Sequence, residues 1–339
     1  MDFIHAQDIV TLKRWLAGAS RPVVVAHTHP DGDALGATCG LALYLRSEGK
    51  DAAVVLPDTP ADNLRFILDR EVPFFFHDED PAGAETRATQ ADLLILADAN
   101  AFNRAEALEP FLKASKAPKI LMDHHLNPDR ESFGLVFSTP DISSASEVVY
   151  WVLKALEANI SKEVGTALLT GMTTDTNNFA NSVFPSTFRM ASELIAAGVD
   201  RDALIGQIYQ SYRENRVRLM GYMQSQELHI LENGTAYMIL TQEIQERFDM
   251  RDGESEGLVN VPLTIEKVRL SVLLKEDGGH FRVSVRSKKG TSAQQLAQRF
   301  FHGGGHENAA GGKVLIGEDI PKADAVPAYL EKVLKDYLK

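Results

Sequence analysis

The 339-residue sequence has a single cysteine, fewer basic than acidic residues and no long hydrophobic run. Cys39 cannot form an internal disulfide bond, which excludes a disulfide-stapled protein and favours a reducing compartment, so we expect a cytoplasmic location. Apolar runs such as residues 93–97 are far shorter than the roughly 20 residues that cross a bilayer, and the first residues lack an export signal. The sequence therefore predicts no membrane partner.

The charge balance excludes a protein that grips long nucleic acid over its whole surface. Thirty-five Lys and Arg stand against 47 Asp and Glu, which gives a net charge of -12. One stretch departs from this balance, because residues 280–300 contain no acidic residue and five basic ones: Arg282, Arg286, Lys288, Lys289 and Arg299. Such a run is often only a solvated surface. The alternative is a local site for a small anionic substrate.

The first half of the sequence alternates short apolar runs with longer helical patterns. The runs are rich in Val, Ile and Leu and fall at residues 22–26, 51–56, 92–97 and 119–122. This alternation predicts an α/β fold with a parallel sheet. The length suits two domains. We expect a catalytic domain over residues 1–190, a helical connector over residues 191–230, and a smaller α/β substrate-binding domain over residues 231–339.

Acidic and imidazole side chains follow the predicted strands. Ligands of parallel α/β sheets bind beyond the carboxyl ends of the strands, so these positions are the first candidates for function. Three strand ends and one later helical segment supply them: His27, Asp31 and Asp33 after the first run, Asp98 after the third, Asp123, His124 and His125 after the fourth, and Asp175. We expect these side chains to meet at one edge of the sheet.

Each of these residues also has a simpler interpretation. Asp33 or Asp98 taken alone is often only a helix N-cap, and the histidines are compatible with ordinary loops. However, carboxylates gathered at one sheet edge repel one another unless cations neutralise them. Two divalent ions balance the four carboxylates of Asp31, Asp33, Asp98 and Asp175, and His27 and His124 complete a mixed oxygen and nitrogen set. With no cysteine ligand and mostly carboxylates, Mn²⁺ or Mg²⁺ is favoured over a thiolate-bound zinc ion; Mn²⁺ is the first expectation, but the residues leave the choice between the two open.

The sequence lacks the motifs of two other kinds of functional site. No G-x-S-x-G elbow follows any predicted strand, which argues against a Ser-His-Asp hydrolase. Gly303-Gly304-Gly305 is followed by His306 instead of the Lys and Ser or Thr of a P-loop. A two-metal site for attack on phosphorus remains the favoured prediction.

These motifs resemble the DHH family of phosphoesterases. The resemblance rests on the motif His27-x-x-Pro30-Asp31-x-Asp33, on Asp98, on Asp123-His124-His125 and on Asp175. The segment from Gly303 to Gly311 resembles the glycine-rich signature of the DHH-associated domain. Within the family, the chain is most similar to the group of bifunctional oligoribonucleases and 3'-phosphoadenosine-5'-phosphate phosphatases.

The resemblance implies a role for each site residue. His27, Asp31 and Asp98 would hold one metal, and Asp33, Asp98, His124 and Asp175 the other, with Asp98 bridging them. His125 would contact the scissile phosphate, Asp123 would orient its neighbours, and a metal-bridging hydroxide would be the nucleophile. The second domain would bind the substrate through a separate set of residues: Arg286, Ser287, Gly303, Gly304, Gly305 and His306.

The expected substrates are therefore short RNA oligonucleotides and 3'-phosphoadenosine 5'-phosphate. Two alternatives stay open: a phosphodiesterase for linear or cyclic dinucleotides of second-messenger turnover, and a nucleotide- or RNA-binding module without catalysis. His302 stands where many relatives have a further glycine, which leaves substrate preference open. The sequence also leaves open the direction of RNA degradation and whether the chain forms a homodimer.

Overall fold

The computed structural model describes residues 1–68 and 71–338, and it divides into two compact units. The first unit is Met1–Ser211 and the second is Tyr212–Lys339. The predicted connector is shared between them, since helices α7 (Pro185–Ala196) and α8 (Arg201–Tyr209) belong to the first unit and α9 (Glu214–Gln226) to the second. Within the described ranges, no helix is both long and apolar enough to cross a bilayer.

The first unit is built on a six-stranded parallel sheet, which confirms the predicted fold class. Its strand order is β3-β2-β1-β4-β5-β6. The strands are β1 (Pro22–Val25), β2 (Ala53–Leu56), β3 (Phe74–Phe76), β4 (Leu93–Ala97), β5 (Lys119–Asp123) and β6 (Leu135–Ser138). Strands β1, β2 and β4 are buried at every position, as their continuous apolar runs predict.

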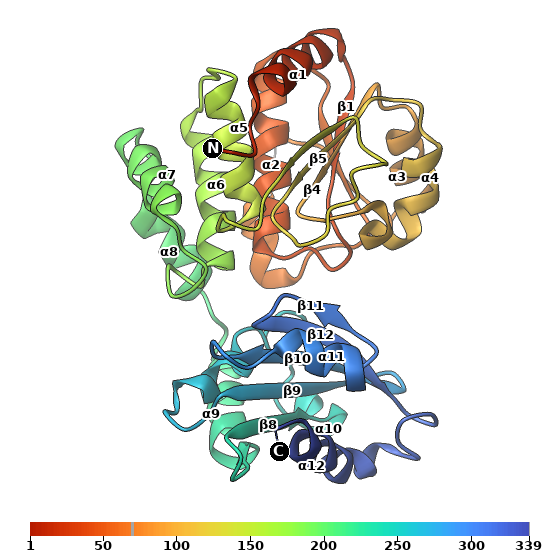
Figure 1. Ribbon diagram of the computed structural model, residues 1–339, viewed down its shortest axis with the longest axis vertical. Coiled ribbons are helices and arrows are strands. Elements are labelled where there is room, and N and C mark those ends of the chain that lie inside the picture. Colours follow the sequence, from red (N-terminus) through yellow and green to blue (C-terminus); the bar gives the residue numbers. More distant parts are fainter. Residues whose placement is uncertain (69–70, 339) are drawn as a thin grey trace. The chain divides into compact units, whose positions relative to one another are not determined.

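Helices cover both faces of this sheet (Figure 1). On one face lie α1 (Ala6–Gly18), α2 (Gly32–Ser47), α5 (Ala145–Ala155) and α6 (Lys162–Asp175), which share one hydrophobic core. On the other face lie α3 (Pro81–Thr89), α4 (Glu109–Ala114) and a 3₁₀ segment, Phe102–Leu108. A further 3₁₀ segment, Asp62–Ile67, packs against the first core. Because both faces are covered, only the strand ends and the loops after them are available for function.

Glycines let α2 approach α6 closely. A Cβ atom on Gly36 would lie 2.7 Å from the Ala167 carbonyl oxygen and from the Gly171 Cα. Gly40, four residues further along the same face of α2, is equally tight against the Leu168 side chain. This close packing brings the start of α2 and the end of α6 together.

The second unit is a six-stranded mixed sheet with helices. Its strand order is β11-β12-β10-β9-β8-β7, and only the β8–β9 pair is parallel. The strands are β7 (His229–Ile230), β8 (Thr235–Leu240), β9 (Leu270–Asp277), β10 (His280–Ser287), β11 (Gly304–Gly305) and β12 (Ala309–Leu315). The remaining helices are α10 (Gln242–Arg247), α11 (Ala293–Phe300) and α12 (Val326–Tyr337), with 3₁₀ segments at Leu258–Thr264 and Ala323–Ala325.

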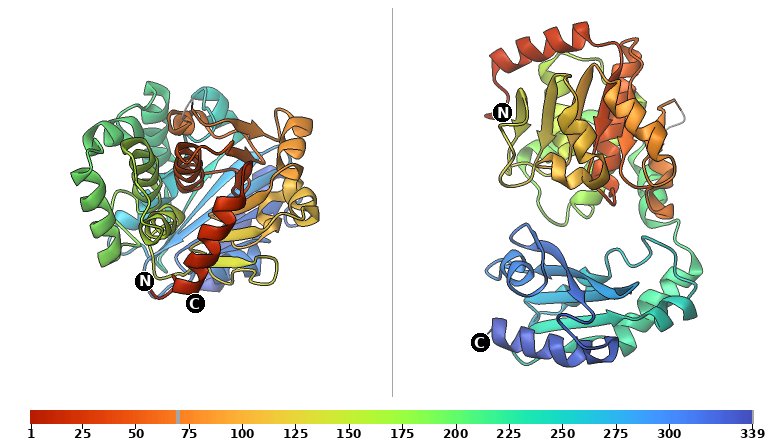
Figure 2. Two further views of the ribbon diagram at one scale, coloured as in Figure 1. Left: turned by 90° about the horizontal axis from the view of Figure 1, so that it is seen from above. Right: turned by 90° about the vertical axis from the view of Figure 1, so that its right-hand side faces the viewer.

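The two faces of the second sheet are covered differently. One face packs on α11 and on α12, the C-terminal helix that lies along the sheet in Figure 2. On the other face, α9 and the 3₁₀ segment Leu258–Thr264 pack against β8 and β9. Strand β10 alternates between half-buried and buried residues, so its side chains Arg282, Ser284 and Arg286 lie on this second face.

Candidate metal centre

The structure brings the predicted acidic and imidazole side chains of the first unit together. These side chains lie at or just after the ends of β1, β4 and β5 and at the last residue of α6. Three groups have possible ligand atoms within 4.8 Å of one another: His27, Asp31 and Asp98; Asp33, His124 and Asp175; and Asp98, Asp123 and His125. Asp98 belongs to two of these groups, so it lies at the centre of the cluster.

Asp98 is almost completely buried between two imidazoles. One carboxylate oxygen, Oδ2, lies 3.3 Å from His27 Nε2, and the other, Oδ1, lies 3.4 Å from His124 Nε2. Oδ1 has no hydrogen-bond partner among the described residues. A buried carboxylate oxygen without a hydrogen bond is costly unless it binds a cation. Asp98 also has a positive φ of 55°, an uncommon conformation for a residue other than glycine.

His27 is held in one orientation by the backbone. Its Nδ1 lies 2.7 Å from the Thr28 carbonyl oxygen, which can only accept a hydrogen bond. Nδ1 therefore carries a proton, and Nε2 is the nitrogen that faces Asp98 and Asp31. A backbone acceptor on the far nitrogen is the usual partner of a histidine that binds a metal.

Asp31 and Asp33 play different structural roles. Asp31 is the N-cap of α2, and its Oδ1 accepts hydrogen bonds from the backbone N–H groups of Asp33 and Ala34. The capping interpretation thus applies to Asp31, and neither Asp33 nor Asp98 caps a helix. Asp33 is only 1% exposed and accepts from the N–H groups of Ala145 and Ser146, where α5 begins. The amino end of α5 therefore helps to stabilise the Asp33 carboxylate.

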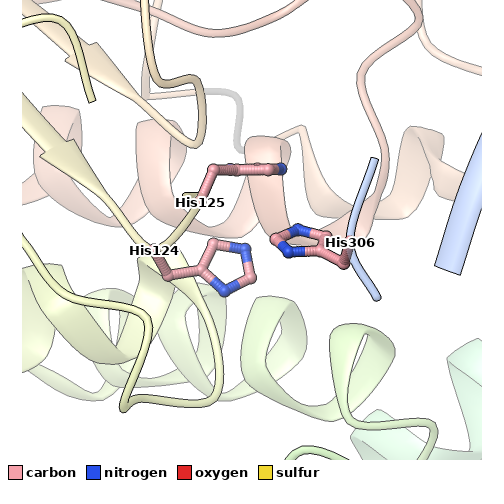
Figure 3. Close-up of side chains that lie close together, drawn as sticks. All are labelled: His124, His125 and His306. Carbon is pink, nitrogen blue, oxygen red and sulfur yellow. The ribbon is translucent and has the colours of Figure 1, made fainter. Parts of the chain in front are cut away.

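Two histidines leave the end of β5 with different partners (Figure 3). Their rings meet edge to face, with centroids 4.7 Å apart. His124 Nε2 lies 3.8 Å from Asp175 and 4.0 Å from Asp33. His125 turns its Nδ1 to the completely buried Asp123, at 2.7 Å, and donates its backbone N–H to the same carboxylate. Asp123 thus orients His125.

The charges of the cluster depend strongly on one another. Burial acts to lower the pKa of His27, but Asp98 and Asp31 outweigh it and raise the pKa to about 9. Burial, Asp98 and Asp175 raise the pKa of Asp33 well above its usual range. Burial also raises the pKa of Asp175 to about 6, assisted by Asp31 and Asp98. Without metal ions, these raised pKa values favour protonation of His27, Asp33 and Asp175. A metal ion that binds here must therefore displace protons.

These residues fit divalent cations. The Asp98 oxygen without a hydrogen bond, the fixed tautomer of His27 and the shared position of Asp98 are features that suit the binding of divalent cations. Carboxylate and imidazole ligands without thiolate suit hard or borderline ions. The predicted assignment of individual ligands to one ion or the other stays a prediction.

One residue at this edge was not anticipated. Asp58 follows β2, and its carboxylate accepts hydrogen bonds from the Thr28 hydroxyl and the His29 backbone N–H. It therefore fixes the loop that carries His27 and Asp31. The strand-end rule applied to the run that ends at Leu56 would have found Asp58.

In the second unit, Arg286 and Ser287 end β10. Arg286 lies on the sheet face opposite the helices α11 and α12, paired with Ser271 and Ala309 on the neighbouring strands. The Ser287 hydroxyl donates to the Thr291 carbonyl oxygen and accepts from the Asn308 amide. The Ser287 hydroxyl hydrogen is thus used within the loop, so this residue contributes to its shape.

The three glycines of the predicted substrate loop have different surroundings. A Cβ on Gly303 would lie 1.9 Å from the Gly311 carbonyl oxygen, and one on Gly305 would lie 2.6 Å from that of Ala309. Gly304 has nothing within 4 Å of such a Cβ. Gly303 and Gly305 are thus required for packing against β12, while Gly304 adjoins open space.

His302 and His306 flank these glycines. His306 begins a tight turn, in which its backbone N–H donates to the Ala309 carbonyl oxygen. His302 has a positive φ of 48°, which explains why glycine suits this position. Its Nε2 pairs with Asp319 at 3.0 Å. The histidine thus adds an ion pair at a position where its backbone conformation is unfavourable.

The comparisons with known proteins agree with both units. A model of the DHH family, N-terminal domain, matches residues 21–172, and a model of the DHHA1 domain matches residues 235–336. The crystal structure of an exopolyphosphatase-related protein from Bacteroides fragilis is similar over 98% of this chain and 97% of its own, with a TM-score of 0.92 and 34% identity.

Two curated relatives are similar over most of their length. A Streptococcus mutans protein named "Probable bifunctional oligoribonuclease and PAP phosphatase NrnA" is 30% identical over 292 residues, 85% of this chain and 88% of that one. A Thermus thermophilus protein named "Bifunctional oligoribonuclease and PAP phosphatase NrnA" is 30% identical over 314 residues, 91% of this chain and 88% of that one. With this fold and centre, the chain is a phosphoesterase. It belongs to the DHH family, and its second unit carries a DHHA1 domain.

Proposed function

We propose that this chain hydrolyses short RNA oligonucleotides and removes the 3'-phosphate of 3'-phosphoadenosine 5'-phosphate. The observation that carries the proposal is the convergence of three strand ends and one helix end on the buried Asp98, whose Oδ1 has no hydrogen-bond partner among the described residues. The names of the relatives from Streptococcus mutans and Thermus thermophilus support the choice of substrates.

Six side chains would hold the metal ions: His27, Asp31, Asp33, Asp98, His124 and Asp175. Two divalent ions bound there would offset the charge of the phosphoryl oxygens and acidify water. We expect two ions, with Mn²⁺ preferred over Mg²⁺, because imidazole nitrogen contributes to an otherwise oxygen-rich set.

Other side chains act on the substrate itself. Asp123 holds Nδ1 of His125, so that Nε2 is the nitrogen that would donate to a phosphoryl oxygen. In the second unit, the guanidinium of Arg286 would bind a phosphate that does not react, and the Gly304 backbone would allow a ligand to approach. His306 would contribute a further hydrogen bond. The cytoplasmic location and the oligomeric state stay predictions.

The first test is a substrate panel. Purified protein with Mn²⁺ is incubated separately with 3'-phosphoadenosine 5'-phosphate, RNA 2-mers to 5-mers, a 24-mer, and linear and cyclic dinucleotides, with Asp98→Ala as the control. We expect AMP from the first substrate and mononucleotides from the short RNAs, all abolished in the variant. Labelling one RNA end reports the direction of degradation.

Other results would contradict the proposal in different ways. A preference for the 24-mer would keep the metal centre but remove the restriction to short substrates. Fastest cleavage of a cyclic dinucleotide would favour second-messenger turnover. Binding without turnover of any substrate, with Mn²⁺, Mg²⁺ and Co²⁺ alike, would indicate a nucleotide-binding module.

A further inference from the structure

Three basic residues form a row across the second sheet, on the face that carries Arg286. Arg282 of β10 is directly opposite Lys275 of β9 on one side and Lys313 of β12 on the other. Residues directly opposite in antiparallel strands have Cβ atoms about 5 Å apart, and like charges in such positions destabilise a sheet. We call Lys275, Arg282 and Lys313 the cationic row.

Two carboxylates lie close to the cationic row. Arg282 Nε lies 2.7 Å from Asp277, and Lys275 Nζ lies 3.5 Å from Asp252, which is 74% exposed. Lys313 is exposed and has no carboxylate within 4 Å in the part of the chain that the structure describes. Exposed ion pairs contribute little stability, so folding alone does not account for three cations in register. An anionic ligand would offset their repulsion.

The cationic row is aligned with Arg286. Arg282 and Arg286 lie four residues apart on β10, and therefore on the same face at a distance of about 13 Å along the strand. Between them lie Ser284 and, opposite it on β12, Gly311. Both are small, and a Cβ on Gly311 would meet only the Val283 carbonyl oxygen, at 3.4 Å. Leu273, opposite Ser284 on β9, is buried, so a chain of phosphates would follow β10 and β12 from Arg286 to the cationic row.

We propose that the cationic row is a second phosphate-binding subsite, which binds a backbone phosphate of a single-stranded oligonucleotide several nucleotides away from Arg286. This inference rests on the proposed function and specifies its substrates. A stacked strand advances about 3.4 Å per nucleotide, so about four nucleotides cover the 13 Å between the two subsites. A dinucleotide or 3'-phosphoadenosine 5'-phosphate reaches Arg286 alone. The cationic row would then favour 4-mers and 5-mers.

The test compares two double variants that change the net charge equally. Lys275→Met with Lys313→Met removes two charges from the cationic row and keeps the apolar stems of the side chains. Lys322→Met with Lys332→Met removes two exposed charges elsewhere in the second unit. Binding of a labelled RNA 5-mer is measured by fluorescence anisotropy in EDTA at several salt concentrations. KM is measured with Mn²⁺ for the 2-mer, the 5-mer and 3'-phosphoadenosine 5'-phosphate.

We expect the row variant to bind the 5-mer roughly tenfold more weakly, as for removal of one charge-assisted hydrogen bond. The slope of log affinity against log salt should fall by about 0.7 for each phosphate that the variant no longer neutralises. KM for the two small substrates should stay within about twofold, since they do not span the distance. The control variant should match the wild type throughout.

Several results would overturn the inference. The cationic row binds no distant phosphate if the two double variants have the same affinity for the 5-mer. The same conclusion follows if the row variant raises KM equally for the 2-mer and the 5-mer. A lower melting temperature of Lys313→Met at low salt would show that the row stabilises the fold, whereas relief of repulsion predicts no decrease. If the wild type hydrolyses none of the substrates, the proposed function fails, and the anisotropy measurement still tests the row separately.

Discussion

The two sheets place their functional residues differently. The first sheet is buried at every position of its central strands, so its functional side chains lie beyond the strand ends. Strand β10 of the second sheet alternates, so Arg282 and Arg286 stand on the face of the sheet itself. A parallel sheet covered on both faces offers a compact centre, whereas a partly open face offers an extended surface. A compact centre suits metal binding, and an extended surface suits contacts along the length of a substrate.

Among residues that are not predicted metal ligands, the largest effect is expected from Asp123→Asn in the first unit. Asparagine keeps the size of the side chain but changes the hydrogen bond to His125 Nδ1, so the imidazole loses its preferred tautomer and orientation. We expect turnover to fall by about 100-fold or more, while the metal content stays the same. Steady-state kinetics and metal analysis of the same sample provide the check. Loss of metal together with activity would mean that Asp123 is itself a ligand.

The next largest effect is expected from disturbing the close packing of α2 against α6, which brings two predicted ligands of the metal centre together. Gly36→Ala would place a Cβ 2.7 Å from α6, and overpacking of this kind costs about 1–3 kcal/mol. We expect a lower free energy of unfolding and weaker metal binding, because α2 and α6 carry Asp33 and Asp175. Gly18→Ala is the matched control, since nothing lies within 4 Å of its Cβ. Unchanged stability of Gly36→Ala in urea denaturation would argue against this packing.

A pair of glycine variants separates packing from ligand approach in the second unit. Gly303→Ala clashes with the Gly311 carbonyl oxygen and should destabilise the protein, whereas Gly304→Ala meets open space and should fold normally. We expect Gly304→Ala to raise KM roughly tenfold by blocking a phosphate near the backbone. Thermal unfolding and KM for 3'-phosphoadenosine 5'-phosphate distinguish the two. A normal KM for Gly304→Ala would mean that the substrate does not touch this glycine.

The smallest effect comes from the ion pair between His302 and Asp319. Asp319 raises the pKa of His302 above its ordinary value of 6.5 in the folded protein. The stabilisation is therefore complete below pH 6.5 and lost as the pH rises through the folded pKa. Because His302 is about half exposed, we expect less than about 1 kcal/mol. Melting temperatures of wild type and His302→Asn should converge at high pH, and a constant difference would contradict this account.

The sequence predicts the first unit well because two simple patterns determine it. Continuous apolar runs identified β1, β2, β4 and β5, and polar residues at their ends identified the centre around Asp98. Strands β3 and β6 were missed because neither is a continuous run of Val, Ile and Leu: β3 consists of three phenylalanines, and β6 ends in Phe137 and Ser138.

Other features depend on contacts that no local pattern reveals. The backbone donors of Asp33 come from α5, over 100 residues later in the chain. The glycines of α2 have a visible four-residue spacing, but their partner α6 is known only from the fold. In the second unit, the alternation of residues 280–287 is visible in the sequence and places Arg282 and Arg286 on one face, but it does not reveal that Lys288 lies beyond the end of the strand. That lysine instead binds the carbonyl oxygens of Ile265 and Glu266.

The hydrogen bonds from Ala145 and Ser146 to Asp33 have a consequence for biosynthesis. They join segments separated by 112 and 113 residues, so the centre cannot assemble while only the first strands have left the ribosome. His27, Asp31 and Asp98 are synthesised before α5 and α6, so the first part of the chain carries only some of the predicted ligands. The complete set of predicted ligands therefore forms only late in synthesis, and metal ions bound to it would stabilise a tertiary structure that has already formed.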